Sequence, residues 1–591
     1  MPMKRDEQAE AARRSLHEQG LTKSLRDIVL NLILMFIVYS IAFANKDHRS
    51  YEHRTFLTKR FVSPTDEDLQ AFDTIIAHND MFNWINGVMI PKLFPELDIN
   101  NDMLHWYYRG FMDGLSHYRL GPPRLRQLRT KSRTCSLPYI DDVKCYHEYS
   151  LFDEETDDYC IGWTDRPCPL EHKVFNYTAD AWSFTSALGI WGLPLTGIIS
   201  TYGGGGYIAQ FDVNKNVSMD IVAELMRNLW VDRKTRAVSF EFTLYSPETN
   251  IFIYNVFMVE FSHTGGTFKT YWIYPIRLYN HIGPNGKLVF GCELLFVIYL
   301  VVLMVKMCVR VYQQRLKYFG KFWQVFEFVI FVIGVSACVI YGIKIGFITL
   351  TISKYRSDMK SFVNFSHIVF WDEMYGILLA VLAFMCTIRI LEVFASSKKV
   401  SFIVKVFEQS GKDLFWYGVS FLYILFGFAL FGLFLFRPYL QSYMTLYRCL
   451  TNLALAMIGK AIFTEMDETN PILAKIYFVF YIITVVFVVL TIFLSILGAS
   501  IDNAVGDMKN DTNEDLMEYL MKRFASLFRL QVTRTNGTGR LKVVKRPRLY
   551  KVYKMGHITE ATYKQEQKLN SNTIRKLRRR AFKPALPIVA E

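Results

Sequence analysis

An uncharged run near the C-terminus, Ile476–Ile501, has the sequence IYFVFYIITVVFVVLTIFLSILGASI. A helix needs about 20 apolar residues to cross the hydrocarbon core of a bilayer, and runs of this length are rare in soluble cores. Five other segments meet or approach this length: Ile28–Asn45, Leu288–Tyr312, Val325–Leu350, Met374–Phe394 and Leu414–Phe436. We therefore predict an α-helical membrane protein with six transmembrane helices, namely helix 1 at 25–45, helices 2 to 4 within 287–395, helix 5 at 414–436 and helix 6 at 472–505.

The composition of the whole chain agrees with this prediction. Its 591 residues are 51% hydrophobic, 16% aromatic and only 21% charged, which excludes disorder over most of the length. The formal net charge is +14, from 68 Lys and Arg against 54 Asp and Glu. A basic excess indicates binding to nucleic acid, binding to anionic lipid, or positively charged cytoplasmic loops. The position of the basic residues along the chain distinguishes these three interpretations.

The distribution of charge predicts which side of the membrane each segment occupies. The Lys306–Lys321 linker has five basic residues and no acid, so we place it in the cytoplasm. Both termini (1–24 and 506–591) and the linker 396–413 then lie on the same side. Residues 506–591 hold 20 bases and 8 acids (+12), whereas the loop 46–286 holds 23 bases and 29 acids (−6). We expect a plasma-membrane protein, with the cilium or endoplasmic reticulum as alternatives.

The long loop 46–286 is predicted to be a folded extracytoplasmic α+β domain between helices 1 and 2. It is too long and too aromatic for a linker. Val238–Phe261 breaks at Ser246–Asn250 into two β-rich halves, which is typical of a hairpin. Ser218–Trp230 has a helical apolar face, with Ser218 as the expected N-cap.

Four of the nine cysteines lie in this loop, at Cys135, Cys145, Cys160 and Cys168. An even number in an oxidising compartment favours disulfides, and the simplest pairing is 135 with 145 and 160 with 168. Zinc is the weaker alternative, because no CxxC spacing is present. We expect no metal and no cofactor. The sequons at Asn176 and Asn216 are candidate glycosylation sites.

A seventh apolar piece, Cys449–Gly459 (CLTNLALAMIG), lies between helices 5 and 6 and is too short to cross the bilayer. Within a membrane, such a segment must pack against protein or line a cavity. The loop 437–471 is therefore predicted to hold a re-entrant pore helix.

This layout, with a large folded loop after the first helix and a pore loop before the last, resembles the polycystin family of the transient receptor potential channel group. Specific motifs carry the resemblance: Leu120–Leu128 (LGPPRLRQL) followed by Cys135 and Cys145, Trp230–Ala237 (WVDRKTRA), Val259–Gly266 (VEFSHTGG), Asn364–Trp371 (NFSHIVFW) and Lys412–Phe415 (KDLF). Together they cover roughly residues 25–505. The resemblance implies a voltage-sensor-like bundle of helices 1 to 4, a conduction unit formed by the last two helices, and a disulfide between Cys135 and Cys145.

The resemblance also implies a homo- or hetero-tetramer with related subunits that passes cations, including calcium, without strong selectivity. The family filter contains Leu-Gly-Asp, and the matching residues here are Ile458, Gly459 and Lys460. Four Asp side chains would attract cations, whereas four Lys side chains would repel them. An acidic outer vestibule could offset the lysine; its candidate residues are Glu465, Asp467 and Glu468.

Three interpretations of Lys460 stay open at this point. Its side chain could turn towards the acids, so that the channel still passes cations. The chain could be a modulatory subunit that contributes one or two lysines to a heteromer. It could also be non-conducting and act as a receptor or mechanosensory subunit through its outer domain.

Two further departures concern gating. The fourth helix has Arg389 followed by Glu392, where the resemblance implies a lysine, so we predict weak voltage dependence. Glu327 in the third helix is the expected partner of Arg389. The lower gate of the sixth helix is assigned to a set of candidate residues, Leu490, Thr491, Leu494 and Leu497, with Thr491 where the family usually has Asn.

In a protein with six membrane spans, the polyanion nearest to the basic tail is the inner leaflet of the membrane. The clusters Lys542–Lys554 and Arg575–Lys583 are candidates for binding anionic phosphoinositide lipid at the inner leaflet, and we expect no nucleic acid as a partner. No catalytic residues are predicted, because GxSxG, HExxH and nucleotide-binding fingerprints are absent from the sequence.

Overall fold

The computed structural model describes residues 26, 29–64, 69–97, 100, 102–135, 144–168, 177–282, 286–320, 322–394, 398–460, 463–509, 530–534 and 541–545. The chain forms two compact units, one of which is Val29–Arg389 and the other of which includes everything from Ile390 onward. Among the described residues, six helices are long and apolar enough to cross a membrane: Val29–Phe61, Gly286–Gln314, Phe322–Ser357, Ser366–Ile390, Gln409–Phe436 and Pro471–Gly506. They contain the six predicted spans, apart from the N-terminal edge of the first, which was predicted from residue 25, and the C-terminal end of the fourth, which was predicted to reach Phe394.

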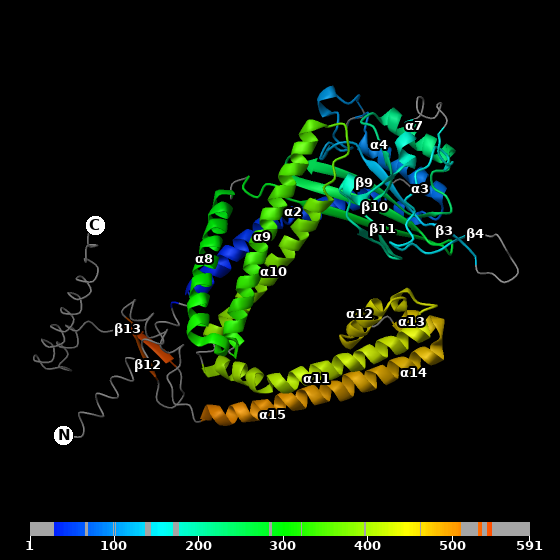
Figure 1. The fold of residues 1–591 in the computed structure, drawn as a ribbon. Helices are drawn as coiled ribbons and strands as arrows, with labels where there is room; N and C mark the ends of the chain where they lie inside the picture. Colours follow the sequence, from blue (N-terminus) through cyan, green and yellow to red (C-terminus); the bar gives the residue numbers. More distant parts are fainter. Residues whose placement is uncertain are drawn as a thin grey trace, which may run out of the picture. The chain divides into compact units, whose positions relative to one another are not determined.

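The domain between the first two spans is built on one antiparallel sheet of seven strands (Figure 1). Its order is β11-β10-β9-β2-β8-β5, and β1 pairs with β9. The strands are β1 (Tyr118–Arg119), β2 (Arg124–Arg129), β5 (Phe184–Thr185), β8 (Gly206–Gln210), β9 (Thr235–Ser246), β10 (Ile251–Phe261) and β11 (Thr267–Ile276). Two small hairpins accompany it: β3 (Ser132–Thr134) with β4 (Lys144–Tyr146), and β6 (Leu195–Thr196) with β7 (Thr201–Tyr202).

Alternation along β9 and β10 gives the sheet two apolar faces. The predicted hairpin is confirmed, with Ser246 paired to Ile251 across a four-residue connection. Phe240, Phe242 and Phe257 join a core with the helices α2 (Arg49–Phe61), α3 (His78–Trp84), α4 (Ile90–Leu93) and α7 (Lys215–Arg227). Figure 1 shows α3, α4 and α7 on the same side of the sheet. Phe252 and Tyr254 belong to the opposite face, which packs on residues that follow α9.

Helix α7 begins earlier than the sequence predicts. Its N-cap is Asn214, whose side chain accepts a hydrogen bond from the Asn216 amide, and the helix starts at Lys215. The prediction that Ser218 is the N-cap is wrong, because Ser218 lies buried inside the first turn and donates its hydroxyl to Asp212 O. Asn is as favourable an N-cap as Ser, so the helix can begin at Asn214, four residues before Ser218, where the packing of Ser218 supports the earlier start.

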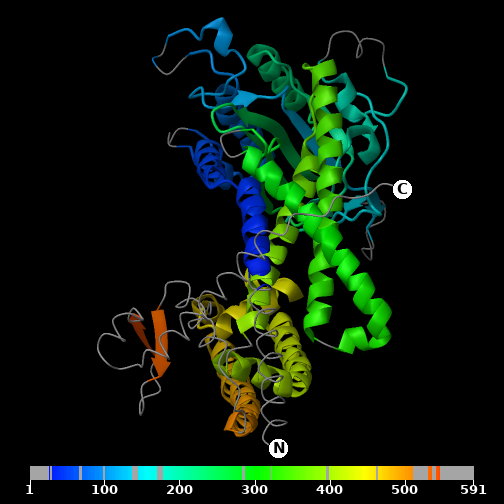
Figure 2. The ribbon, with the colours of Figure 1, turned by 90° about the vertical axis from the view of Figure 1, so that its left-hand side faces the viewer.

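The first span packs with three long helices into a bundle. These are α8 (Gly286–Gln314), α9 (Phe322–Ser357) and α10 (Ser366–Phe394), and Figure 2 shows α8 and α9 joined as a hairpin. The shared core includes Val38, Phe296, Ile330 and Leu382. The apolar parts of these helices pack by shape, because lipid on the outside is as apolar as their side chains.

The second unit is a helical hairpin with a short helix packed against it (Figure 1). Its elements are α11 (Lys398–Phe436), α12 (Leu446–Met457), α13 (Phe463–Thr469), α14 (Pro471–Tyr481), the π-helical segment η7 (Ile482–Val489) and α15 (Leu490–Lys509). Residues 398–413, predicted as a linker, are helical and continue directly into the fifth span. In the tail, β12 (Leu530–Arg534) pairs with β13 (Leu541–Lys545); most of the two basic clusters lies outside the described residues.

Candidate functional site

Helix α12 is a short helix that packs against Tyr477 and Tyr481 of the sixth span. It begins at an N-cap, Thr445, whose side chain accepts from the Arg448 amide. Its buried face presents Cys449 and Leu453 to the hairpin, and Tyr481 donates its hydroxyl to Leu453 O at 2.7 Å. The predicted re-entrant segment is therefore a helix of 12 residues, too short to span the membrane.

The three predicted filter residues form the C-terminal cap of this helix. The Gly459 amide donates to Ala456 O at 3.1 Å, and the Lys460 amide donates to Leu455 O at 3.0 Å. This pair of bonds is the Schellman motif, which requires a left-handed residue at the position of Gly459 (φ 84°). Ile458 is 77% exposed in the single chain. The motif fixes the backbone of Lys460 beside the negative end of the helix dipole, where a cation is favourable.

The predicted vestibule acids lie on α13, just beyond the cap. Glu465 accepts a hydrogen bond from the Ser442 hydroxyl at 3.1 Å, and Asp467 pairs with Lys475 at 3.4 Å. Glu468 is exposed. One of the three carboxylates is thus already balanced by a lysine of the same chain, so the acidic field here is weaker than the sequence alone indicates.

The predicted gate residues share the outward face of α15. Leu490, Thr491 and Leu494 are exposed and Leu497 is half-buried, whereas Ser500 and Ala504 pack inward. The preceding π-helical segment η7 shifts the register of the sixth span, a feature frequent at functional sites. Thr491 donates its hydroxyl to Phe487 O, so its side chain is bonded along its own helix.

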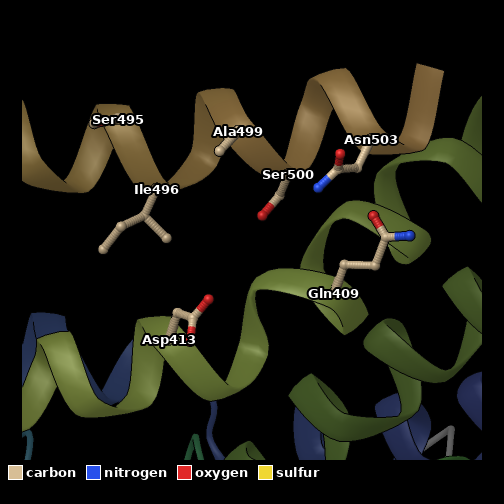
Figure 3. A pocket seen from close by; sticks show the side chains of 7 residues that line it. All are labelled: Gln409, Asp413, Ser495, Ile496, Ala499, Ser500 and Asn503. Carbon is tan, nitrogen blue, oxygen red and sulfur yellow. The ribbon is translucent and has the colours of Figure 1, made fainter. Parts of the chain in front are cut away.

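A polar cavity of about 680 Å³ lies between α11 and α15, and the sequence-based reasoning missed it. Figure 3 shows Asp413 and Gln409 of α11 facing Ser500 and Asn503 of α15. Asp413 belongs to the KDLF motif. These residues lie at the ends of the fifth and sixth spans, Gln409–Phe436 and Pro471–Gly506. The signal available in the sequence was the return of polar residues at the end of the uncharged sixth span.

The expected contact of the sensor-like helices is present. Arg389 donates to Glu327 at 2.8 Å and to the Tyr299 hydroxyl at 3.0 Å. Arg310, which the sequence reasoning did not assign, contacts the other oxygen of Glu327 at 2.5 Å. One carboxylate therefore bridges two guanidinium groups from α8 and α10. Glu392 lies in α10, but its side chain is outside the described part of the structure.

A second buried charge pair lies at the opposite end of the bundle and was also missed. Lys344 of α9 contacts Asp372 of α10 at 2.7 Å, and each side chain is only 1% exposed. Lys46 reaches the second oxygen of Asp372 at 3.2 Å. Lys344 also donates to Arg277 O at 3.4 Å, and Arg277 pairs with Asp47. A lysine inside the apolar run of α9 was the signal that could have found this cluster.

The arginines of the LGPPRLRQL motif are buried in β2. Arg124 and Arg126 both contact Glu241 of β9, at 2.6 and 2.9 Å. Burial alone would raise the pKa of Glu241, but the two guanidinium groups outweigh it and lower that pKa to about 2. Arg126 also donates to Gly203 O and Gly204 O, which ties the glycine-rich segment to the sheet.

Disulfides join Cys135 to Cys145 and Cys160 to Cys168, the pairing that the sequence predicts. The candidate glycosylation site Asn216 is exposed in the first turn of α7, and Asn176 lies outside the described residues.

The six spans and the re-entrant helix define a multi-pass membrane protein with a pore-loop architecture. Comparison with known families agrees: the model of the Polycystin domain matches residues 71–279, and that of the Polycystin cation channel matches residues 285–504. The chain belongs to the polycystin family, as its motifs predict.

Individual relatives are distant. Human polycystin-2-like protein 1 is 23% identical over 471 residues, which cover 79% of this chain and 56% of that protein. Zebrafish (Danio rerio) polycystin-2 is 23% identical over 519 residues, covering 86% of this chain and 55% of that protein. Mouse polycystin-2-like protein 2 is 23% identical, covering 78% and 73%. For the human and zebrafish proteins, the region that matches this chain covers about half of the relative's length.

Proposed function

We propose that this chain is a modulatory subunit of a calcium-permeable, non-selective cation channel, assembled as a tetramer with related subunits. The observation that carries the proposal is the capped helix α12, whose terminus presents Ile458, Gly459 and Lys460 on the exposed face of the hairpin. Four such termini around an axis would form a constriction, with backbone dipoles that favour cations.

Lys460 explains why we favour a modulatory role. The Schellman bonds fix its backbone, so the ammonium group can move only about its own side-chain torsions. Four lysines at one constriction would oppose the dipoles, whereas one or two in a mixed tetramer would lower calcium permeability without closing the pore. A channel formed by this chain alone is the second candidate, favoured by the acids of α13.

The experiment compares this chain alone with the chain co-expressed with a conducting relative. We expect little current from the chain alone and an altered calcium-to-sodium permeability in the mixed channel. Lys460→Asp should raise that permeability ratio severalfold, because it replaces a repelling charge with an attracting one. Arg437→Asp, the same charge change at the end of α11, is the matched control. A permeability ratio unchanged by Lys460→Asp would remove Lys460 from the permeation path.

Gating and placement belong to the same proposal. Weak voltage dependence follows from a fourth helix whose basic residue Arg389 is held by Glu327 and Tyr299. The outward leucines of α15 would form the lower gate. Both termini would be cytoplasmic, the tail would meet anionic phosphoinositide, and Asn216 would carry a glycan. The role proposed here involves no enzymatic step.

A further inference from the structure

An open cavity of about 640 Å³ lies beside the Cys135–Cys145 disulfide, in the domain between the first two spans. Five separate segments line it: the start of α3, Cys135 after β3, strand β4 with His147, the residues at the start of β9, and the turn that joins β10 to β11. The proposed conduction path does not use this cavity. Much of its lining comes from two motifs of the sequence, Trp230–Ala237 and Val259–Gly266, to which the sequence alone assigned no binding role.

The lining of this cavity is basic, although the domain as a whole is acidic. Among the described lining residues, Lys144, Arg233 and Arg236 supply three positive charges, and Asp232 supplies one negative charge. Asp232 is already engaged by Arg129, with two contacts of 2.9 and 3.0 Å. Three histidines complete the set of basic side chains: His78, His147 and His263. A positive cavity in a domain of net charge −6 focuses anions at one place.

Arg236 makes the positive charge a fixed part of the wall. It is 5% exposed and donates to Tyr146 O at 2.8 Å and to His147 O at 2.9 Å. Two further bonds go to Arg233 O and Thr235 O. Among the described residues, its hydrogen-bond acceptors are all main-chain carbonyls. The nearby acid, Asp232, is shared with Arg129, so the buried guanidinium of Arg236 is only partly compensated and an anion at the cavity is favoured.

The remaining lining is suited to a sugar. Ser262 and Thr264 bring two hydroxyl groups, 2.7 Å apart and hydrogen-bonded to each other, to one rim, and Thr267 beside them donates to Ile75 O. A hydroxyl has one donor and two acceptor sites, so these groups keep acceptor capacity for the hydroxyls of a sugar. The Tyr146 ring lines another part of the cavity, with the Arg233 guanidinium 5.6 Å from its centroid. Arg and Lys with mobile exposed ends can reach sulfate or carboxylate groups, and an aromatic ring offers an apolar surface to the C–H face of a pyranose.

We infer that this cavity binds an anionic polysaccharide through its sulfate or carboxylate groups. Arg236 supplies the fixed charge at the wall, while Lys144 and Arg233 close on the anionic group from the rim. The hydroxyls of the β10–β11 turn bind the sugar itself. Binding at this place would let an extracellular matrix or cell-surface glycan act on the domain that covers the spans.

The test uses the full chain in lipid nanodiscs and a fluorescent heparin-derived hexasaccharide. We expect saturable binding that weakens as salt rises, since the rim charges are exposed to solvent. The double variant Lys144→Gln/Arg233→Gln should bind at least about tenfold more weakly, a loss of about 1.4 kcal/mol. The matched control Lys59→Gln/Arg227→Gln removes two exposed basic residues of the same domain outside the cavity, and should bind within twofold of the wild type.

Competitors identify the source of the anionic group. Displacement by a sialylated oligosaccharide supports a carboxylated ligand, and failure of that displacement supports a sulfated one. Displacement by a chemically desulfated hexasaccharide, which keeps its carboxylates, also supports a carboxylated ligand. Displacement by poly-glutamate, at the same concentration as the parent compound, would overturn the inference, because it would show that negative charge without a sugar is sufficient. Equal losses in both double variants would overturn it as well. Hydrogen exchange across β9 and β10 verifies that the variants are folded. The assay requires no current, so its failure would leave the proposed channel function untouched.

Discussion

Two histidines fasten α2 to the segment that precedes β1, and their contact predicts that mild acid loosens the outer domain. His53 Nδ1 lies 2.9 Å from His117 Nε2, and Ser116 Oγ lies 2.7 Å from His117 Nδ1. His53 Nε2 lies 2.9 Å from the Thr249 hydroxyl. His117 is 2% exposed and stacks on Phe56. This chain requires a hydrogen-bond acceptor on one of the two facing nitrogens, so at least one of the rings must be neutral.

The magnitude follows from the pKa of His117. Burial, with the neighbouring His53 adding to it, lowers this pKa to about 4, against about 6.5 in an unfolded chain. Between about pH 6.5 and pH 4, His117 binds a proton in the unfolded state but stays neutral in the folded state. The free energy of unfolding therefore falls as the pH falls. The loss is about 2 kcal/mol at pH 5 and approaches about 3 kcal/mol below pH 4.

Hydrogen exchange measures this directly. The opening free energy of peptides covering 50–58 and 110–120 is compared at pH 7 and pH 5, after correction for the intrinsic exchange rates. Wild type should lose about 2 kcal/mol. His117→Gln keeps hydrogen-bonding capacity but cannot titrate, so it should lose less than half of that. His263→Gln, at an exposed histidine, should behave as wild type. The same pH dependence in wild type and His117→Gln would refute the reasoning.

Three further outcomes are expected. Glu241→Gln should lower the free energy of unfolding of the outer domain by about 3–5 kcal/mol, because two buried arginines lose their carboxylate; thermal unfolding measures it, and Glu248→Gln, at an exposed glutamate, should change nothing. Asp372→Asn should reduce the yield of folded protein in size-exclusion profiles, and adding Lys344→Met should restore it; no restoration would contradict a charge-pairing origin. Arg389→Gln should leave the slope of the conductance–voltage curve nearly unchanged in a mixed channel, whereas a clear flattening would show that it carries gating charge.

The sequence predicted those parts of the fold that depend on local pattern. Apolar length located the six spans, alternation located the β9–β10 hairpin, and a short apolar run located α12. These features are properties of consecutive residues, so one chain without relatives suffices to find them. The motif around Cys135 and Cys145 then identified the family, which the comparisons confirm.

Contacts between residues far apart in the sequence could not be predicted in this way. Lys344 and Asp372 lie 28 positions apart, and only the packing of α9 on α10 brings them together. The arginines of β2 alternate with leucines as an exposed strand would, yet the strand is central and every residue in it is buried. The sequence pattern alone cannot show that Glu241 of the neighbouring strand β9 pairs with Arg124 and Arg126. The continuity of α11 through 398–413 was missed because charged residues in that segment resemble a loop when burial is unknown.

The same distant contacts show that the outer domain and the four-helix bundle are one folding unit. The second face of the sheet is completed by Phe362 and Phe365, which follow α9, and Arg124 lies over the Phe362 ring at 4.0 Å. Asn364 donates to Trp191 O at 2.6 Å, which ties this segment to the domain from the other side. Cutting the chain at 286 would expose these apolar strands and leave Arg277 O without Lys344. A force or ligand acting on the domain therefore reaches α9 and α10 through a packed core rather than through a flexible tether.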